Sequence, residues 1–269
     1  MGSDVLAMTS GGEAPSDAYA ALADYYDLDH AHLRDDVELY LQLADVVGDP
    51  ILELGCGSGR VLRPLAEAGH RVVGVDRSAP MLERARAALA AYPDERATLV
   101  AGSMAEANLA PGGPFGLVLF TLNGLLHLTG LAEQRAALLA ARAALDPRGM
   151  LVLDLMNPTP DALASFDGRV LHEGSWRSDD GTETDRFSAR THDSASQRIT
   201  TTLWYDSVAA DGRLHRARSR FDMRYLGKSE VELLLELCGF ASWIIYGSYE
   251  LDPFADDSER LLVTAEVTP

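Results

Sequence analysis

The 269-residue sequence predicts an α/β fold built around a mostly parallel β-sheet. Segment 51–76 gives the first reason, because it reads as a strand, a glycine loop, a helix and a second strand that ends in an acid. The second reason is that apolar strand-like runs alternate with helix-like segments as far as Met156. Beyond that residue the pattern changes to period two, which predicts an antiparallel insertion in the sheet.

Segment 51–76 also predicts where a ligand binds. Residues 51–54 form a short apolar run typical of a buried parallel strand, and residues 72–76 form the second strand. The loop 55–59 between strand and helix contains three glycines, so its backbone can approach a ligand closely. Ligands of open parallel sheets bind outside the carboxyl ends of the strands. Asp76, at such an end, is therefore placed to accept hydrogen bonds from two ribose hydroxyls.

The spacing of the glycines indicates the cofactor. A dinucleotide-binding loop has the pattern G-x-G-x-x-G, whereas this loop has G-x-G-x-G, with Arg60 where that pattern has Gly or Ala. Glu53 adds negative charge where a pyrophosphate would lie, which favours a cationic nucleoside such as S-adenosylmethionine. The sequences E-L-G-C-G-S-G, V-V-G-V-D and S-x-P-M-L resemble the first two motifs of class I S-adenosylmethionine-dependent methyltransferases.

This resemblance covers residues 19–156 and implies a fold and an activity. The fold is the Rossmann-like class I methyltransferase fold, with a seven-stranded, mostly parallel sheet and an N-terminal helical lid. The activity is transfer of a methyl group from S-adenosylmethionine to a nitrogen or oxygen of a small molecule, with some similarity to sugar-amine N-methyltransferases. We expect a disordered lead-in over 1–17, lid and cofactor-binding core over 18–156, an inserted antiparallel β meander capping the substrate over 157–225, and the rest of the core over 226–269.

The resemblance also implies which residues hold the cofactor. The loop glycines lie against its methionine portion, and Asp76 holds the ribose. Ser103 stands where relatives usually carry an acid that bonds the adenine amine; it can accept one hydrogen bond there, and the backbone N–H of Met104 can donate to the ring. The full set of expected cofactor-binding residues is Tyr25, Glu53, Gly55, Cys56, Gly57, Gly59, Asp76, Arg77, Met81, Ser103, Met104, Phe120 and Thr121.

Two residues, Tyr26 and His127, are candidates for the catalytic step. Tyr25 and Tyr26 match a Tyr-Asp element of the family's lid, where a phenol oxygen or ring can face the activated methyl group; packing of the lid on the core is the open alternative. His127 resembles the histidine that some sugar-amine N-methyltransferases carry after the fourth strand. It is the leading candidate for a general base, with an ionisation expected near pH 6.5, and a structural histidine is the alternative.

The remaining elements are expected from the same patterns. Helices are expected over 19–26, 34–47, 60–68 and 129–145. Another helix is expected to begin after a cap at Ser78, and the last one to run from a Ser229–Glu232 capping box to Cys238. Further strands are expected over 98–101, 115–120, 150–156, 243–249 and 260–267. The family resemblance implies that the last of them is antiparallel to its neighbours.

The insertion contains three strand-like runs, over 186–192, 198–206 and 214–225. The third run places Arg216, Arg218, Arg220 and Arg224 on one face. We expect a solvated face paired with the many acids of the chain, and a binding wall for an anionic acceptor is the alternative.

Composition excludes several classes of protein. The formal net charge of −18 opposes binding to nucleic acid, and no apolar run has the roughly 18 residues of a membrane span. The N-terminus lacks the basic and apolar regions of a secretory signal, and two cysteines indicate no disulfide framework, so we expect a cytoplasmic protein. The seven histidines show no metal-binding spacing. The expected partner is a small-molecule methyl acceptor, and the protein is expected to be a monomer or homodimer.

Two other functions are compatible with parts of this pattern. An intact glycine loop and Asp76 also suit a non-catalytic relative that binds the nucleoside as a regulatory or partner-binding module. A nicotinamide-dependent oxidoreductase is the less favoured alternative, because Arg60 and the glycine spacing oppose a dinucleotide.

Overall fold

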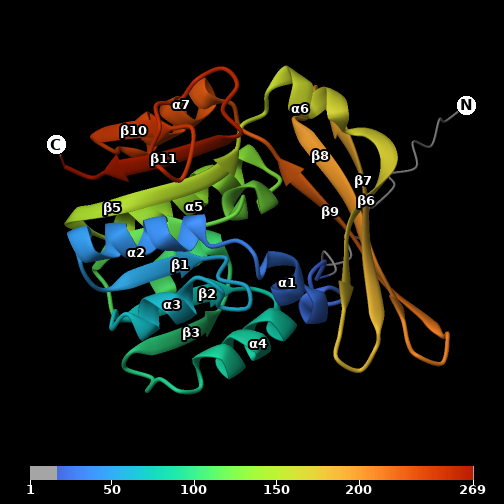
Figure 1. Ribbon diagram of the computed structural model, residues 1–269. Coiled ribbons are helices and arrows are strands. Elements are labelled where there is room, and N and C mark those ends of the chain that lie inside the picture. Colours follow the sequence, from blue (N-terminus) through green and yellow to red (C-terminus); the bar gives the residue numbers. More distant parts are fainter. Residues whose placement is uncertain (1–16, 269) are drawn as a thin grey trace, which may run out of the picture.

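The computed structural model describes residues 17–268, without the side chains of residues 107–109. It contains a seven-stranded sheet and a separate four-stranded sheet (Figure 1). The strands of the larger sheet have the order β10-β11-β5-β4-β1-β2-β3. Their bounds are β1 (Ile51–Leu54), β2 (Val72–Asp76), β3 (Ala97–Ala101), β4 (Phe115–Phe120), β5 (Leu145–Met156), β10 (Ser242–Tyr246) and β11 (Arg260–Glu266).

The larger sheet is mostly parallel, and its topology places the ligand crevice. Strand β1 pairs in parallel with β2 on one side and β4 on the other, and the chain continues to β3 in one direction and to β5 in the other. The point between β1 and β4 is therefore the topological switch point, where ligands of such sheets bind. Strand β11 is antiparallel to both β5 and β10, as the sequence predicted.

Helices cover both faces of this sheet, and the apolar residues of the strands divide between two cores. The helices α2 (Asp35–Val47), α3 (Leu62–Glu67) and α4 (Ala79–Leu89) enclose one cluster of buried residues with Ile51 and Leu117. The helices α5 (Leu131–Ala144) and α7 (Lys228–Cys238) enclose the other with Leu52 and Val118. Because both faces are covered, β1 and β4 are buried along their whole length, which explains why β4 has no charged or polar side chain and why Glu53 is the one such residue of β1.

The four-stranded sheet is the antiparallel meander. Its strands are β6 (Asp167–Arg177), β7 (Glu183–Asp193), β8 (Arg198–Val208) and β9 (Leu214–Arg224), and each pairs antiparallel with the next. It follows helix α6 (Pro160–Ser165) and stands beside the end of the core where α1 (Ala23–His30) lies (Figure 1). Leu22, Leu203 and Tyr205 form a small buried cluster between the N-terminal segment and this sheet.

The elements of the structure differ from the expected ones in several places. The strand expected over 243–249 already ends at Tyr246, and the one expected over 150–156 begins at Leu145. The helix predicted over 19–26 begins only at Ala23, and Tyr19 lies in the turn before it. Strand β6 was not predicted, because it is an edge strand whose residues are mostly exposed and show no alternation of burial. The α7 cap lies two residues earlier than predicted: Glu230 accepts a hydrogen bond from the backbone N–H of Gly227 (3.2 Å), so Ser229 is already inside the helix.

The four arginines of β9 do not share one environment. Arg218 and Arg220 are exposed, on the opposite face of the strand from Phe221, and Arg216 bonds Asp206 across the strand pair. Arg224 is buried instead, because the end of β9 meets the helices of the core, and it donates to Gln134 (2.9 Å) and Glu230 (3.0 Å). This arrangement favours a solvated face over a binding wall for Arg218 and Arg220.

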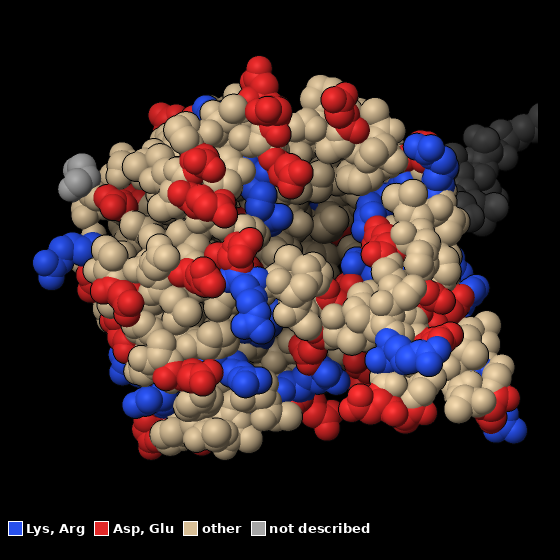
Figure 2. Space-filling view, viewed as in Figure 1, with Lys and Arg blue, Asp and Glu red and all other residues tan. Residues whose placement is uncertain are grey.

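The acidic composition is visible on the surface. In Figure 2, acidic side chains are scattered over both layers of the face shown, with basic side chains between them and a hollow between the core and the four-stranded sheet. Within residues 17–268, no helix is long and apolar enough to cross a membrane. In the same part of the chain, no group of three or more His, Cys, Asp or Glu side chains is arranged to hold a metal ion. Residues 1–16 of the predicted lead-in lie outside the described residues.

Candidate active site

A pocket lies at the switch point, outside the carboxyl ends of β1, β2, β3 and β4. Two of the loop glycines line it, and both have left-handed backbone conformations, with φ of 82° at Gly55 and 53° at Gly57. Glycine is favoured at position 57 by this positive φ, and a Cβ atom there would also come within 3.2 Å of the Met81 side chain. The lining residues are Asp17, Tyr19, Tyr26, Gly55, Gly57, Asp76, Arg77, Ser78, Met81, Gly102, Ser103, Met104, Thr121, Leu122, Gly124, His127 and Leu128.

The carboxylate of Asp76 is fixed at the floor of this pocket. Its two oxygens accept hydrogen bonds from the backbone N–H groups of Gly57 (2.9 Å) and Ser78 (2.8 Å). Burial raises the pKa of Asp76, against the lowering effect of these two hydrogen bonds. The local sequence explains the geometry, since the strand ends at Asp76 and Ser78 then caps α4 by accepting from the N–H of Met81.

Most of the expected cofactor residues meet in this pocket. Arg77, Met81, Ser103, Met104 and Thr121 line it together with the glycines and Asp76. Their assembly follows from the topology, because each lies directly after or at the carboxyl end of a parallel strand or in the first turn of the next helix.

Glu53 lies under the pocket and does not line it. Its Oε1 atom accepts a hydrogen bond from the hydroxyl of Thr121 (2.8 Å), while its Oε2 atom is buried without a hydrogen-bond partner in residues 17–268. Burial raises the pKa of Glu53 to about 8. A buried oxygen that lacks a partner fits a polar or cationic group bound above it.

Four other expected residues, Tyr25, Cys56, Gly59 and Phe120, do not line the pocket. Cys56 is buried in the core cluster that α2, α3 and α4 enclose, with its sulfur beside Gly74. Phe120 is fully buried in the core cluster on the opposite face of the sheet. Gly59 packs against Ala85 of α4. Tyr25 stacks on Tyr205 of the meander with ring centroids 4.5 Å apart. Their positions support packing roles, because loop and lid residues alternate between the pocket and its surroundings.

The structure adds seven residues to the pocket that the sequence analysis did not select as site residues: Asp17, Tyr19, Ser78, Gly102, Leu122, Gly124 and Leu128. The contacts of two of them are specific. Asp17 accepts a hydrogen bond from the hydroxyl of Ser78 (2.7 Å), so it is held in place although the predicted lead-in extends to it. The hydroxyl of Tyr19 lies 3.0 Å from Nε2 of His127. A weak signal existed for Tyr19, because a third tyrosine stands close before the Tyr25-Tyr26 pair.

A second pocket adjoins the first. It lies between α1, the turn after β4 and the inner face of the meander, and its remaining lining residues include Leu22, Asp29, His30, Asn123, Arg186, Arg190, Thr201, Leu203, Tyr205, Phe221 and Met223. Tyr19, Tyr26, Leu122 and His127 line both pockets and therefore form the boundary between them. A group in one pocket can reach a group in the other only past these four residues.

His127 is neutral at this boundary. Burial, together with the positive charge of Arg77, lowers the pKa of His127 to about 4. The ionisation expected near pH 6.5 is therefore wrong, because burial removes water from the imidazole and the charge of Arg77 opposes its protonation. Burial also raises the pKa of Tyr19 and of Tyr26, so both phenols keep their protons at neutral pH.

The far side of the second pocket is polar. Asp29 is buried and accepts hydrogen bonds from Arg186 (2.7 Å) and from the hydroxyl of Tyr205 (3.0 Å). Arg190 pairs with Glu173, so the charges beside this pocket balance. The hydroxyl of Thr201 is buried in the pocket wall without a hydrogen-bond partner among the described residues. This side can therefore bind polar groups of a ligand, while the boundary side is aromatic.

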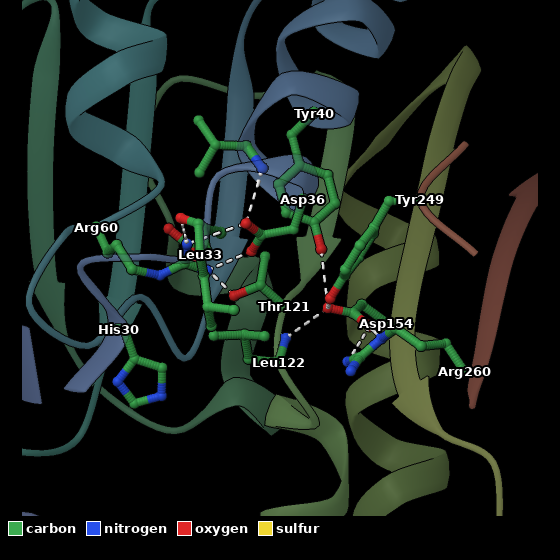
Figure 3. Close-up of polar contacts among 12 residues, drawn as sticks. His30, Leu33, Asp36, Tyr40, Arg60, Thr121, Leu122, Asp154, Tyr249 and Arg260 are labelled. Atoms are coloured by element: carbon green, nitrogen blue, oxygen red, sulfur yellow. Dashed lines mark hydrogen bonds and ion pairs between the residues drawn. The ribbon is translucent and has the colours of Figure 1, made fainter. Parts of the chain in front are cut away.

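Arg60, which distinguishes the loop from a dinucleotide site, has a structural partner. Its guanidinium forms two hydrogen bonds with the carboxylate of Asp36 at the start of α2 (Figure 3). It also donates to the carbonyl oxygen of Leu33 (3.4 Å). The ion pair thus joins the N-terminal helices to the segment that follows the glycine loop.

Comparison with known proteins gives a consistent assignment. Residues 51–149 match the methyltransferase domain family. The cypemycin N-terminal methyltransferase of a Streptomyces species is 29% identical over 223 residues, which cover 81% of this chain and 83% of that protein. A dTDP-3-amino-3,6-dideoxy-alpha-D-glucopyranose N,N-dimethyltransferase from Streptomyces fradiae is 31% identical over 159 residues, or 55% of this chain and 59% of that protein. The solved structure of the CcbJ methyltransferase from Streptomyces caelestis has a TM-score of 0.73 at 26% identity, covering 94% of this chain and 98% of that chain.

The fold, the pocket at the switch point and these likenesses define an S-adenosylmethionine-binding enzyme. The chain is a class I S-adenosylmethionine-dependent methyltransferase that acts on small molecules. The predicted fold, cofactor and reaction type are confirmed, and neither the non-catalytic module nor the oxidoreductase is favoured.

Replacing Asp76 should weaken cofactor binding. We expect Asp76→Ala to lower the affinity for S-adenosylhomocysteine at least tenfold, since a hydrogen bond to a charged group contributes about 1.5–3 kcal/mol. The loss has a second source in this structure, because the carboxylate also orients the backbone at Gly57. Isothermal calorimetry measures the change, and Asp94→Ala, at an exposed acid away from the pocket, is the control. Unchanged affinity in Asp76→Ala would show that the ribose is held elsewhere.

Proposed function

We propose that this enzyme methylates an amine nitrogen of a small molecule bound in the second pocket. The observation that carries the proposal is the shared boundary, where Tyr19, Tyr26, Leu122 and His127 line both pockets. An acceptor in the second pocket meets the cofactor pocket only there. The names of the two curated relatives, an N-terminal methyltransferase and an amino-sugar N,N-dimethyltransferase, support nitrogen as the methylated atom.

The residues of the first pocket suit the cofactor. S-adenosylmethionine, when bound, supplies a methyl group already activated by its sulfonium centre. We assign Gly55 and Gly57 to close backbone contact and Asp76 to the ribose. Arg77, Met81, Ser103 and Met104 are assigned to the surroundings of the adenine. Oε2 of Glu53 is buried without a hydrogen-bond partner among the described residues, which supports a polar group bound above it. With a pKa of about 8, this carboxyl is mostly protonated at neutral pH, so it adds little of the negative charge that the sequence analysis expected.

His127 is suited to orienting an amine rather than to deprotonating an ammonium ion. An alkylammonium group has a pKa of about 10.4 in water, so moving its proton to an imidazole of pKa about 4 is unfavourable by roughly 9 kcal/mol. A neutral imidazole can instead accept a hydrogen bond from an N–H of the neutral amine. That contact would direct the nitrogen lone pair across the boundary, and proximity and exclusion of water supply much of the rate.

Tyr26 completes the boundary on the lid side. It lines both pockets, and its ring stacks against His30 with centroids 4.2 Å apart, which restricts its motion. We assign the phenol and ring of Tyr26 to contact with the reacting methyl group, in keeping with the attraction between cations and aromatic faces.

A competition between matched acceptors tests the proposed nitrogen specificity. The enzyme is incubated with S-adenosylmethionine carrying a labelled methyl group and with pairs of compounds that differ only in an amino or hydroxyl group, including amino sugars and short peptides. We expect label in the amines alone. Label in the hydroxyl compounds, with none in the amines, would contradict the proposal.

A thermal shift confirms that the preparation used for this test binds its cofactor. S-adenosylhomocysteine at about 100 times its dissociation constant should stabilise the protein by roughly 2.7 kcal/mol, while NAD at the same concentration should leave the melting temperature unchanged. A shift with NAD and none with S-adenosylhomocysteine would overturn the cofactor assignment.

A further inference from the structure

The turn after β4 has an unusual backbone. Leu122 and Asn123 both lie in the left-handed region, with φ of 42° and 67°. Asparagine tolerates this conformation, but leucine rarely adopts it, so the surrounding structure must hold Leu122 there. Leu122 is also one of the four residues that line both the cofactor pocket and the second pocket. The disfavoured conformation therefore lies at the boundary where the reaction takes place.

The carboxylate of Asp154 holds this turn from behind. Asp154 is on β5, is fully buried and lines neither pocket. Its Oδ2 atom accepts a hydrogen bond from the backbone N–H of Leu122 (3.0 Å), and its backbone carbonyl accepts one from the N–H of Asn123 (2.8 Å). The turn is thus bonded to a single residue at two successive amides.

Three other elements hold Asp154 itself. Tyr40 of α2 and Tyr249, in the segment after β10, each donate a hydroxyl hydrogen bond to Oδ2 (3.0 Å in both cases). Arg260 of β11 donates to Oδ1 (2.6 Å from its Nε). Figure 3 shows these side chains and the backbone N–H of Leu122 converging on Asp154. The ion pair with Arg260 is sufficient to neutralise the charge of Asp154. The hydrogen bond from Leu122 is therefore not needed for that purpose and has a separate role.

We propose that Asp154 is a positioning residue, which keeps Leu122 in its left-handed conformation and so sets the wall between cofactor and acceptor. The inference rests on the proposed function only in taking the second pocket as the acceptor site. Its chemical consequence is that the surroundings of the reacting methyl group depend on a residue that contacts neither ligand. The turn can adopt a relaxed backbone if the carboxylate is lost.

The test compares Asp154→Asn with Tyr249→Phe. The first variant keeps the size of the side chain, but its amide has only one acceptor oxygen. It therefore cannot accept the hydrogen bonds from Leu122, both tyrosines and Arg260 together. The second removes one donor to the same carboxylate without touching the turn, so it controls for lost stability in the network. Both are measured as full-length proteins by amide hydrogen exchange, and by calorimetry with S-adenosylmethionine and with S-adenosylhomocysteine. The two ligands differ by the methyl group and the sulfur charge, so the ratio of their affinities reports on the surroundings of the methyl group.

We expect exchange at Leu122 to accelerate about tenfold or more in Asp154→Asn and to stay near the wild-type rate in Tyr249→Phe. We also expect Asp154→Asn to lower the affinity for S-adenosylmethionine about fivefold more than the affinity for S-adenosylhomocysteine. The reason is that a pocket wall that is no longer preorganised binds the methyl group less well. If Asp154 has a purely structural role, the variant should bind both ligands more weakly by the same factor. Wild-type exchange at Leu122, or an unchanged affinity ratio, in a folded Asp154→Asn protein would overturn the inference.

If Asp154→Asn fails to fold, Leu122→Gly keeps the inference testable. Glycine adopts the left-handed conformation without strain, whereas Leu122→Ala loses most of the same side chain and keeps the strain. The amide of residue 122 should keep slow exchange in Leu122→Gly, and this variant should be more stable than Leu122→Ala. Equal stability of the two variants, or fast exchange at residue 122 in Leu122→Gly, would show that the turn is not held under strain. None of these readouts uses an amine, so failure of the amine assay and failure of this inference are separate results.

Discussion

Arg60→Gln is expected to lower the free energy of unfolding by about 3–5 kcal/mol, the usual cost of removing one partner of a buried ion pair. The carboxylate of Asp36 is almost completely buried, and only 14% of the Arg60 side chain is exposed. Glutamine cannot neutralise the charge, so Asp36 would remain buried and unpaired. Urea unfolding at pH 7 measures the change.

Arg84→Gln is the matched control for Arg60→Gln. Arg84 also joins the N-terminal helices to the core, through Asp24 and Asp27, but its partners are 91% and 46% exposed. An exposed pair contributes about 0–1 kcal/mol, so this variant should unfold close to the wild type. Equal losses in the two variants would show that the Arg60 pair has no special contribution to stability.

The ion pair of Arg60 with Asp36 is also expected to affect the cofactor site. Arg60 directly follows the glycine loop, and α2 carries Tyr40 of the Asp154 network.

A double variant identifies the cause of the lost stability. Arg60→Met with Asp36→Leu replaces the buried charges with apolar groups and should regain much of the stability. Recovery of stability would identify the unpaired carboxylate as the cause of the loss in Arg60→Gln.

His127→Asn is expected to lower turnover of an amine acceptor by about 10²-fold, the effect of losing orientation at the reacting atom. Affinity for S-adenosylhomocysteine should change little, because residues along the strand ends also hold the cofactor. The pH profile of turnover should keep its shape between pH 6 and 9, since a histidine of pKa about 4 is neutral throughout this range. The rising limb in both proteins would then belong to the amine itself.

The pH profile separates the possible roles of His127. If wild-type turnover rises with an apparent pKa near 6.5 and this rise disappears in His127→Asn, His127 is the general base that the sequence analysis favoured. Full turnover in the variant would remove His127 from the mechanism. A loss of stability without a loss of specific activity would make it a structural histidine.

The low pKa of His127 can be checked without an acceptor. Its folded pKa of about 4 lies below the unfolded value of about 6.5, so the unfolded chain binds more protons in this interval and acidification from pH 7 to pH 5 costs about 2 kcal/mol through this group. Glu53 acts oppositely, because its folded pKa of about 8 is raised and its contribution to stability decreases as the pH rises through that value. Only the histidine contribution is lost in His127→Asn. The variant should therefore lose less stability than the wild type between pH 7 and pH 5 in urea unfolding.

The cofactor half of the site could be predicted from short stretches of sequence. Glycine spacing, an acid at a strand end and a capped helix each depend on neighbouring residues, and parallel strands bring such ends to one edge of the sheet. The orientation of individual side chains could not be predicted in this way. Cys56 and Gly57 are adjacent in sequence, yet one faces the core and the other the pocket.

The sequence by itself determined the order of the strands and helices of the core, the loop conformation at Gly55 and Gly57 and the position of Asp76, because periodicity and glycine act over a few residues. It did not determine α6 or β6. Tertiary structure decided the rest of the site. Tyr19 meets His127 across 108 residues, and Arg260 meets Asp154 across 106. Such pairs depend on how the lid, the meander and the last strand pack against the core. The neutrality of His127 and the left-handed conformation of Leu122 follow from burial and from that packing, which no local pattern encodes.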